Sequence, residues 1–148
     1  MLAIGGTFET LHIGHQYLLS EAASISDVII VGITSTKFAK LNKLYIVSDF
    51  HKRRKRVINF LNRYPDKKVE VSCLEDPYGP STTSSDIKVL VVTPDTYKNA
   101  KRINEIRKTL GLKPLILYVA GYLRNSWGYP INSTYIKLGY MDEWGRIT

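Results

Sequence analysis

The sequence has one cysteine, no long apolar run and no low-complexity tract, and each absence narrows what the protein can be. Cys73 has no partner for an internal disulfide, and one cysteine with three histidines makes a structural zinc site unfavourable. The longest apolar run, Val28–Ile33, is far too short to cross a bilayer. The N-terminus lacks the basic start and long apolar core of a signal peptide. We therefore expect a cytoplasmic protein with no membrane partner.

The length and charge of the chain indicate its size class and its partners. At 148 residues it fits one domain, residues 1–148, with a well-formed core. The net charge of +8 favours anionic partners such as nucleotides, phosphorylated metabolites or nucleic acid. Much of that charge lies in the run His51–Arg56. A solvated helix face is the favoured interpretation of this run, and a basic nucleic-acid-binding module is the alternative.

Short apolar runs alternate with longer amphipathic segments along the chain. Most of the runs are continuous, which is typical of parallel strands covered on both faces. We expect an α/β fold with a five-stranded parallel sheet flanked by helices. The predicted strands are Met1–Ile4, Val28–Ile33, Val69–Leu74, Ile87–Val92 and Leu115–Val119.

Three helices are predicted between these strands. The first runs from Gly14 to about Ala23, and the second turns Phe50, Val57, Ile58 and Leu61 to one face. In the third, Thr93 is the expected N-cap and Pro94 the first helical residue, while Gly111 ends the segment. Its expected inner face is Tyr97, Ala100, Ile103 and Leu110.

Ligands of open α/β sheets bind beyond the carboxyl ends of the strands, so the turns there are the places to search. Several of these turns carry hydroxyls or backbone donors suited to phosphate. The long loop Glu75–Ser85 also interrupts the alternation, and loops of that length are usually functional or disordered. The turns are Gly5–Phe8, Thr34–Thr36, Thr93–Asp95 and, after a further loop, Ile131–Thr134.

The segment Gly5–His15 carries the clearest chemistry. Gly5 and Gly6 allow a sharp turn and a close approach to a ligand. His12 and His15 share a face if a helix begins near Ile13, and Gly14 leaves space for a phosphate between them. The first amides of that helix would add an anion site. Two imidazoles there would donate hydrogen bonds to phosphate oxygens whose charge grows in a transition state.

Other uses of the same residues are less favoured. Metal binding by the His12 and His15 pair has no further cysteine or carboxylate cluster to support it. Two ordinary helix-start histidines would leave the surrounding pattern unexplained. The glycine patterns of P-loop proteins and of dinucleotide-binding proteins are both absent, which reduces the support for those nucleotide folds.

Here the sequence resembles the class I nucleotidyltransferases. The segment GTFETLHIGH at Gly6–His15 matches their Gly-Thr-Phe-x-x-x-His-x-Gly-His motif, and INSTYIK at Ile131–Lys137 is similar to their Ile-Ser-Ser-Thr-x-Ile-Arg motif. Three internal stretches resemble the archaeal type of pantetheine-phosphate adenylyltransferase. These are DPYGPS at Asp76–Ser81, VVTPDTYKNAKRINEIR from Val91, and GLKPL at Gly111–Leu115.

This resemblance implies a Rossmann-like nucleotidyltransferase fold and a reaction. AMP would pass from ATP to 4′-phosphopantetheine by in-line attack, giving dephospho-coenzyme A and pyrophosphate in coenzyme A synthesis. The partners would be ATP and 4′-phosphopantetheine, with no nucleic acid, and the enzyme a monomer or small homo-oligomer. Mg²⁺ would be carried mainly by the nucleotide phosphates, and no metal ligand of the protein is expected.

The family pattern assigns roles to residues of this chain. His15 and His12 would stabilise the transition state, and a lysine after the second strand would complete the site, with Lys40 slightly favoured over Lys43 and Lys37. Arg53 matches a recurrent arginine and is either an anion-binding residue or plain helix surface. The expected substrate- and ATP-binding residues are Gly6, Thr7, Phe8, Gly14, His15, Asn132, Ser133, Thr134 and Lys137.

Three positions depart from the family pattern. Glu9 replaces the usual aspartate, and Asn132 replaces the first serine of the second motif but keeps helix-capping ability. Tyr135 replaces the usual arginine, which removes a fixed cation from the triphosphate end, and Lys137 compensates only partly. Glycerol-phosphate cytidylyltransferase and FMN adenylyltransferase share both motifs and remain alternatives, as does a degenerate member that binds nucleotide without catalysis.

Overall fold

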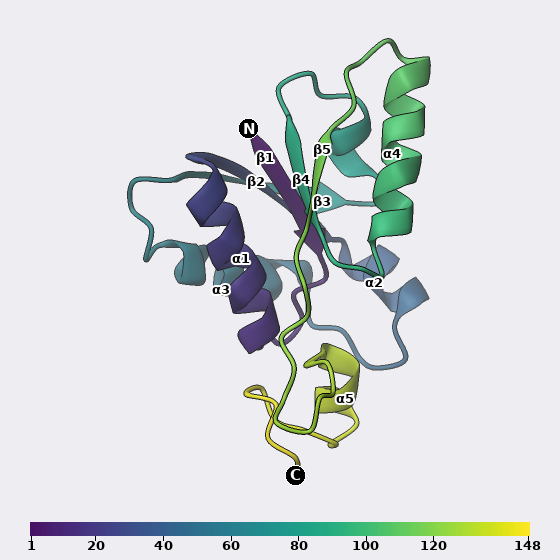
Figure 1. Ribbon diagram of the computed structural model, residues 1–148. Helices are drawn as coiled ribbons and strands as arrows, with labels where there is room; N and C mark the ends of the chain where they lie inside the picture. Colours follow the sequence, from purple (N-terminus) through teal and green to yellow (C-terminus); the bar gives the residue numbers. More distant parts are fainter.

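The structure, a computed structural model, describes residues 1–148, and five parallel strands form its one sheet (Figure 1). The order across the sheet is β3-β2-β1-β4-β5, which confirms the predicted parallel α/β architecture. The strands are β1 Leu2–Gly6, β2 Val28–Thr34, β3 Lys68–Leu74, β4 Val89–Val92 and β5 Ile116–Val119. The helices are α1 Ile13–Ile25, α2 Thr36–Asn42, α3 Phe50–Leu61, α4 Tyr97–Thr109 and α5 Ser133–Lys137, with a 3-10 turn, η1, at Gly79–Thr82.

Helices cover both faces of the sheet, and the strands are therefore apolar on both sides. In β1, Leu2 and Ile4 point into the core that is formed with α1 and α3, while Ala3 points into the core on the α4 side. Figure 1 shows α1 and α3 on one side of the sheet and α4 on the other. This two-sided burial explains why the strands read as continuous apolar runs rather than as alternating patterns.

The strand order reverses between β1 and β4. From β1 the chain builds outward through β2 to β3, and it then returns to place β4 on the other side of β1. Such a switch point opens a crevice beyond the carboxyl ends of the strands. In Figure 1, α5 and the C-terminal segment lie beyond this end of the sheet. The fold thus brings the last helix to the place where β1 leads into α1.

The third predicted helix begins later than expected. Its N-cap is Thr96, not Thr93, and the helix runs from Tyr97 to Thr109. The Thr93 hydroxyl hydrogen-bonds within the turn, to Asp95 and Thr96, instead of capping the helix. Ala100 and Ile103 are buried as predicted, whereas Tyr97 and Leu110 are exposed and were wrongly placed on the inner face.

Helix α2 was not predicted, and a buried arginine was missed. Ser35 caps α2, with its hydroxyl accepting a hydrogen bond from the Phe38 amide. The missed arginine is Arg107 of α4, which is 2% exposed and donates to the carbonyl oxygens of Lys113, Ser81 and Ser84. It therefore ties the loop after β3 to the end of α4.

Arg53 in the basic run is fully buried, so the interpretation as plain helix surface is wrong for this residue. Its side chain is 0% exposed, while the rest of the run is exposed. The guanidinium donates to the backbone oxygens of Ser48, Thr7 and Thr34 at 2.8–3.0 Å. Its Nε atom lies 3.9 Å from the Glu9 carboxylate, which is also buried. Arg53 therefore joins the carboxyl ends of β1 and β2 to the start of α3.

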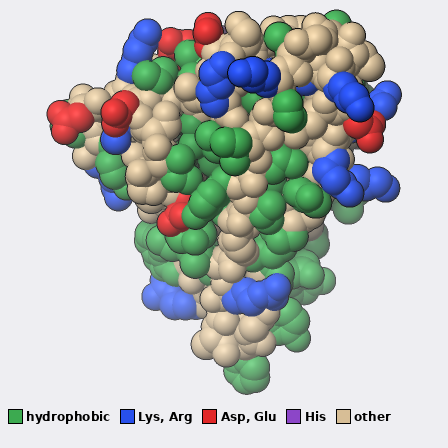
Figure 2. Space-filling model, turned by 45° about the horizontal axis from the view of Figure 1, so that its top comes forward, with side chains coloured by type: hydrophobic (Ala, Val, Ile, Leu, Met, Phe, Trp, Pro, Cys, Tyr) green, Lys and Arg blue, Asp and Glu red, His purple; other side chains and the backbone are tan.

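The helices and the surface were also compared with what a membrane or a charged partner would require. None of the helices is both long enough and apolar enough to span a bilayer. On the face in Figure 2, Lys and Arg side chains are scattered in separate groups, and hydrophobic side chains occupy much of the middle. Ile116 of the edge strand β5 is among the exposed apolar side chains of the molecule.

The buried position of Arg53 predicts a large loss of stability on its removal. Arg53→Met would leave three backbone carbonyl oxygens without their buried donor and would remove the positive charge beside the Glu9 carboxylate. We expect a loss of about 3–5 kcal/mol in the free energy of unfolding. Arg54→Met, one residue further on the exposed side of α3, should change it by less than about 0.5 kcal/mol. Urea denaturation of both variants measures this, and equal losses would contradict the role given to Arg53.

Candidate active site

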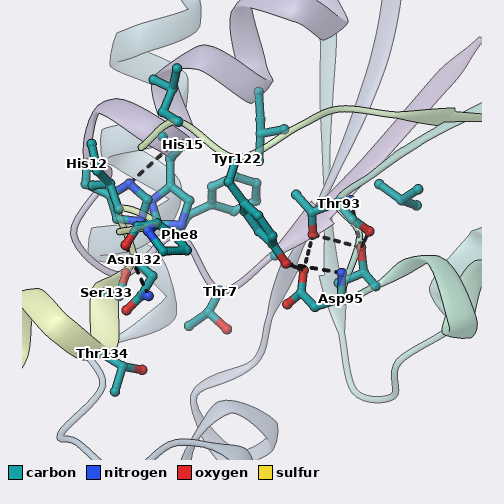
Figure 3. A pocket seen from close by; sticks show the side chains of 18 of the residues that line it. Thr7, Phe8, His12, His15, Thr93, Asp95, Tyr122, Asn132, Ser133 and Thr134 are labelled. Atoms are coloured by element: carbon teal, nitrogen blue, oxygen red, sulfur yellow. Dashed lines mark hydrogen bonds between the residues drawn. The ribbon is translucent and has the colours of Figure 1, made fainter. Parts of the chain in front are cut away.

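A cavity of about 510 Å³ lies beyond the carboxyl ends of β1 and β4. The starts of α1 and α5 form one wall, and the segments that follow β4 and β5 form the other (Figure 3). Nine residues that the sequence analysis assigned to the site line this cavity. They are Gly6, Thr7, Phe8, His12, Gly14, His15, Asn132, Ser133 and Thr134.

The turn after β1 is made by different residues than expected. Gly5 and Gly6 are the last residues of β1, and neither has a positive φ angle. The left-handed conformations occur at Phe8 (φ 53°) and Leu11 (φ 43°). For residues with a side chain this conformation costs roughly 1–2 kcal/mol. Gly6 has a packing role instead, since a Cβ there would lie 3.2 Å from the buried Phe8 ring.

His12 and His15 stack on each other at the start of α1. The helix begins at Ile13, one residue before the predicted start at Gly14, and His12 is its N-cap. The Nδ1 atom of His12 accepts a hydrogen bond from the His15 amide at 3.3 Å. The ring centroids are 3.7 Å apart and the planes differ by 18°. Gly14 makes this stacking possible, because a Cβ there would lie 2.9 Å from Cε1 of His12. Gly14 therefore leaves the space that the His12 ring occupies.

Burial makes both imidazoles neutral at physiological pH. His12 is 5% exposed, and burial lowers its pKa to about 4. Burial, together with the nearby His12 and the positive charge of Lys43, holds the pKa of His15 well below its usual value. The Nδ1 atom of His15 is buried and hydrogen-bonds to no group of the chain. His15 is therefore a neutral ring with hydrogen-bonding capacity left for a ligand.

The backbone amides at the start of α1 are only partly available to an anion. The Ile13 amide donates to the Glu143 carbonyl at 3.1 Å, and the His15 amide donates to His12. The Gly14 amide lies between them and has no hydrogen-bond partner in the chain. The predicted anion site at this helix start is thus narrowed to the amide of Gly14.

The second motif lies against the first. Asn132 caps α5, with its side-chain oxygen accepting from the Tyr135 amide at 2.8 Å. The hydroxyls of Ser133 and Thr10 are 3.2 Å apart, which links the start of α5 to the turn before α1. Tyr135, at the position of the usual arginine, lines the cavity and is partly exposed.

Two basic residues assigned to the site lie elsewhere. Lys40 is exposed in the last turn of α2 and does not line the cavity. Lys43, the alternative considered, does line it. The Lys137 ammonium also stays outside and lies 3.4 Å from Oε1 of the buried Glu9. The structure therefore favours Lys43 over Lys40, and it gives Lys137 an internal partner.

Glu9 is part of the framework beneath the site. Its carboxylate accepts hydrogen bonds from the amide and the hydroxyl of Ser48. Burial acts to raise the pKa of Glu9, but these hydrogen bonds and the charge of Lys137 together lower it. The longer side chain at this position thus reaches partners on both the α2–α3 connection and α5.

The residues of the opposite wall were not predicted from the sequence. Asp95 and Tyr122 line the cavity together with Thr93, and Tyr45 lies on the α2–α3 side. The turn Thr93–Asp95 was predicted to face ligands, although neither residue was assigned a role. Tyr122 lies in a loop after β5, where no motif or periodicity marked it.

A second cavity of about 220 Å³ adjoins the first. Leu74 at the end of β3 and Pro77 and Tyr78 of the Asp76–Ser81 loop contribute apolar surface to it, and Asp76 and Asn99 contribute polar groups. The Asn99 side chain donates to the Pro77 carbonyl at 2.8 Å, which fixes this loop on α4. Both cavities are lined by Ile4, Gly5, Gly6, Val91, Val92 and Thr96, so they meet at the ends of β1 and β4.

Known proteins are similar to this chain in sequence. The family model for cytidylyltransferase-like proteins matches residues 3–139. A phosphopantetheine adenylyltransferase of Methanosarcina mazei is 38% identical over 99% of this chain and 96% of that protein. One of Pyrobaculum aerophilum is 35% identical over 92% of this chain and 88% of that protein.

Solved structures are also similar to this chain in fold. A protein with unknown function from Archaeoglobus fulgidus has a TM-score of 0.73 at 32% identity and covers 80% of this chain and 87% of that one. A lipopolysaccharide core biosynthesis protein from Thermoplasma volcanium, at 16% identity, has a TM-score of 0.62 over 82% of this chain and 97% of that one, and shares the fold alone. The chain belongs to the cytidylyltransferase-like family, and within it to the archaeal type of phosphopantetheine adenylyltransferase.

Proposed function

We propose that the protein transfers the AMP group of ATP to 4′-phosphopantetheine, giving dephospho-coenzyme A and pyrophosphate, a step of coenzyme A synthesis. The observation that carries this proposal is that both nucleotidyltransferase motifs line one cavity, at whose edge a second cavity opens. The archaeal relatives that are named for this activity support it.

The triphosphate of ATP would bind between α1 and α5. The groups available there are the Gly14 amide, the hydroxyls of Ser133 and Thr134, and the imidazole of His15. Lys43 supplies a positive charge on the same cavity wall. Tyr135 brings a hydroxyl and no charge, so neutral donors hold much of the triphosphate end.

The transfer itself needs positioning and charge stabilisation rather than a covalent enzyme intermediate. An oxygen of the acceptor phosphate attacks the α-phosphorus of ATP, and the bond to the β-phosphate breaks in line as pyrophosphate leaves. Negative charge then increases on the oxygens around the α-phosphorus. A neutral imidazole donor at His15, with its ring already desolvated and fixed against His12, stabilises that charge without reorganising.

We propose that Mg²⁺ enters the site bound to the triphosphate. The chain brings together no group of three or more His, Cys, Asp or Glu side chains that could hold a metal ion. Thr7, Ser133 and Thr134 instead bring hydroxyls suited to the phosphate oxygens. Mg²⁺ bound in this way neutralises charge on the phosphates of the nucleotide.

The acceptor would occupy the second cavity with its pantetheine arm. Phe38, Leu74 and Tyr78 offer apolar surface there, and Asn99 and Asp76 offer polar groups for the amides of the arm. Since the two cavities meet at Gly5 and Gly6, the phosphate of the acceptor would approach the α-phosphate of ATP near Thr7. Glycerol phosphate, the acceptor of a related activity, has no arm to fill this space.

We place the reaction in the cytoplasm, with ATP and 4′-phosphopantetheine as partners and no nucleic acid. A lone free cysteine, Cys73, suits a reducing compartment. A monomer or a small homo-oligomer remains our prediction for the assembly.

The choice of substrate is tested by a matrix of nucleotides and acceptors. The purified protein is incubated with ATP or CTP and with phosphopantetheine, glycerol 3-phosphate or FMN, and released pyrophosphate is measured. We expect release with ATP and phosphopantetheine. Release with CTP and glycerol phosphate alone, or with FMN alone, would replace the proposed reaction by another of the same family.

The role of His15 predicts a loss of rate rather than of ATP affinity. His15→Ala removes a donor to the transition state, and we expect kcat to fall by about 10²–10³-fold. The KM for ATP should change much less, because the other phosphate donors remain. His51→Ala is the matched control, since His51 is exposed on α3 and lines neither cavity. Near-normal turnover of His15→Ala would refute the mechanism.

The neutral imidazoles predict a stability loss in mild acid. An unfolded histidine takes up a proton below pH about 6.5, whereas the folded protein resists protonation of His12 down to its pKa of about 4. The unfolded state therefore binds more protons in this interval, and stability falls as pH is lowered from 6.5 toward 4. The contribution is at most about 1.4 kcal/mol per pH unit for each imidazole.

Urea midpoints at pH 7 and pH 4.5 measure this dependence. His12→Asn keeps a side chain that caps helices but does not titrate, so it should lose less stability between the two pH values than the wild type. His51→Ala should lose as much as the wild type. Identical losses in the wild type and His12→Asn would show that His12 is not buried in its neutral form.

A further inference from the structure

A hairpin that follows α5, residues 140–148, contacts both nucleotidyltransferase motifs. In it, Met141 and Ile147 form an antiparallel bridge, and the Asp142 amide donates to the Arg146 carbonyl at 2.8 Å. Figure 1 shows this yellow segment beside α5 and near the start of α1. None of its residues lines either cavity, so the hairpin acts on the site only through the residues that it contacts.

The hairpin contacts the first motif through its backbone. The Glu143 carbonyl accepts a hydrogen bond from the Ile13 amide at 3.1 Å. Ile13 is the first residue of α1, and an amide at that position has no partner within the helix. The contact therefore fixes the start of α1 on the hairpin, and it leaves the next amide, that of Gly14, to a ligand.

The hairpin contacts the second motif at Gly145. This residue is buried and has a φ angle of 84°, and a Cβ on it would lie 2.6 Å from Cδ1 and 2.8 Å from Cγ1 of Ile131. Ile131 is the first residue of the second motif, is 7% exposed and lines the main cavity. Its carbonyl oxygen in turn would lie 3.4 Å from a Cβ on Gly14. Gly145 thus allows the hairpin to pack directly behind the point where the two motifs meet.

Asp142 holds the turn of the hairpin in one shape. Its Oδ1 atom accepts hydrogen bonds from the amides of Trp144 and Arg146 at 2.9 and 2.8 Å. Its Oδ2 atom accepts from Nε of Arg146 at 2.5 Å. The two contact points on either side of Trp144, the Glu143 carbonyl and Gly145, therefore keep a fixed position relative to each other.

We propose that this hairpin sets the spacing between the two motifs and that Gly145 is its positioning residue. This inference rests on the proposed function, because donors on α1 and α5 must contact oxygens of the same triphosphate. A displacement of about 1 Å between the two sets of donors would lengthen these hydrogen bonds and lower the affinity for the triphosphate. A nucleoside has no phosphate, so its affinity does not depend on this spacing.

The test compares each nucleotide with its own nucleoside. Gly145→Ala forces Ile131 to move and displaces the second motif from the first. Binding of ATP and CTP is measured by calorimetry without acceptor, and binding of adenosine and cytidine by displacement of the triphosphate. Because hydrogen bonds to charged groups are lost, we expect Gly145→Ala to bind the preferred triphosphate about 10- to 100-fold more weakly than the wild type. The affinity for the corresponding nucleoside should stay within about threefold of the wild type.

Gly111→Ala is the matched control. Gly111 also has a left-handed backbone, with φ 72°, but a Cβ there meets no atom within 4 Å. It is exposed at the end of α4 and lines neither cavity. This variant has a similar backbone strain without the contact to Ile131, and it should bind triphosphate and nucleoside as the wild type does.

Asp142→Ala tests the same role without a steric clash, and it decides if Gly145→Ala does not fold. It removes the acceptor of the two turn amides and loosens the hairpin. We expect the affinity for the triphosphate to fall and the affinity for the nucleoside to stay unchanged. Unchanged affinity for the triphosphate in this variant would contradict the proposal.

Three results with Gly145→Ala would overturn the proposal. The variant binds the triphosphate as the wild type does, or it loses affinity for triphosphate and nucleoside equally, or Gly111→Ala loses as much affinity for the triphosphate. A wild type that prefers CTP would refute the proposed nucleotide and not the role of the hairpin, because the comparison is then made with cytidine. A wild type that binds neither triphosphate more tightly than its nucleoside would contradict both.

Discussion

The buried contact between Arg53 and its partners is the constraint on which the site depends. Because the Arg53 guanidinium has no contact with water, its hydrogen-bond acceptors must be groups of the protein. It donates to backbone oxygens at the ends of β1 and β2. Glu9 lies beside it and is bonded in turn by Ser48 and Lys137. One buried charge network thus connects two strand ends, the start of α3 and α5. The two segments that we propose to bind phosphate, one near each end of the chain, are both attached to that network.

Desolvation sets the chemistry of the two histidines. Stacking and burial keep the rings of His12 and His15 neutral, so they act as oriented hydrogen-bond donors or acceptors rather than as fixed cations. Position 14 requires glycine for a steric reason, because a Cβ there would come too close to the His12 ring. The pattern His-x-Gly-His therefore serves the packing of the two rings as well as supplying their hydrogen-bonding groups. Lys43 supplies the positive charge that the histidines do not.

The two cavities follow from the topology of the sheet. β1 and β4 are neighbours although they are far apart in the sequence, and the chain leaves their carboxyl ends toward opposite faces. The first cavity, which we propose for the nucleotide, is bounded by α1 and α5, and the second by the Asp76–Ser81 loop and α4. Gly5 and Gly6 lie where the cavities meet, and the absence of side chains there keeps them close. Under the proposed function, the two substrates would be held apart over most of their length and meet at one point.

The sequence by itself determined the strands, their parallel arrangement, the start of the first helix to within one residue and the two phosphate-type motifs. Each of these depends on residues close together in the chain, through apolar periodicity, capping or turn chemistry. Only the tertiary structure decided that Arg53 is buried, that Lys137 pairs with Glu9, that Lys43 rather than Lys40 lines the cavity, and that Tyr122 meets Asp95. The neighbouring sequence of a long charged or aromatic residue does not show whether its side chain lies on the surface, in an ion pair or on a cavity wall. Its partner comes from a distant segment, and that contact exists only once the sheet has brought the segments together.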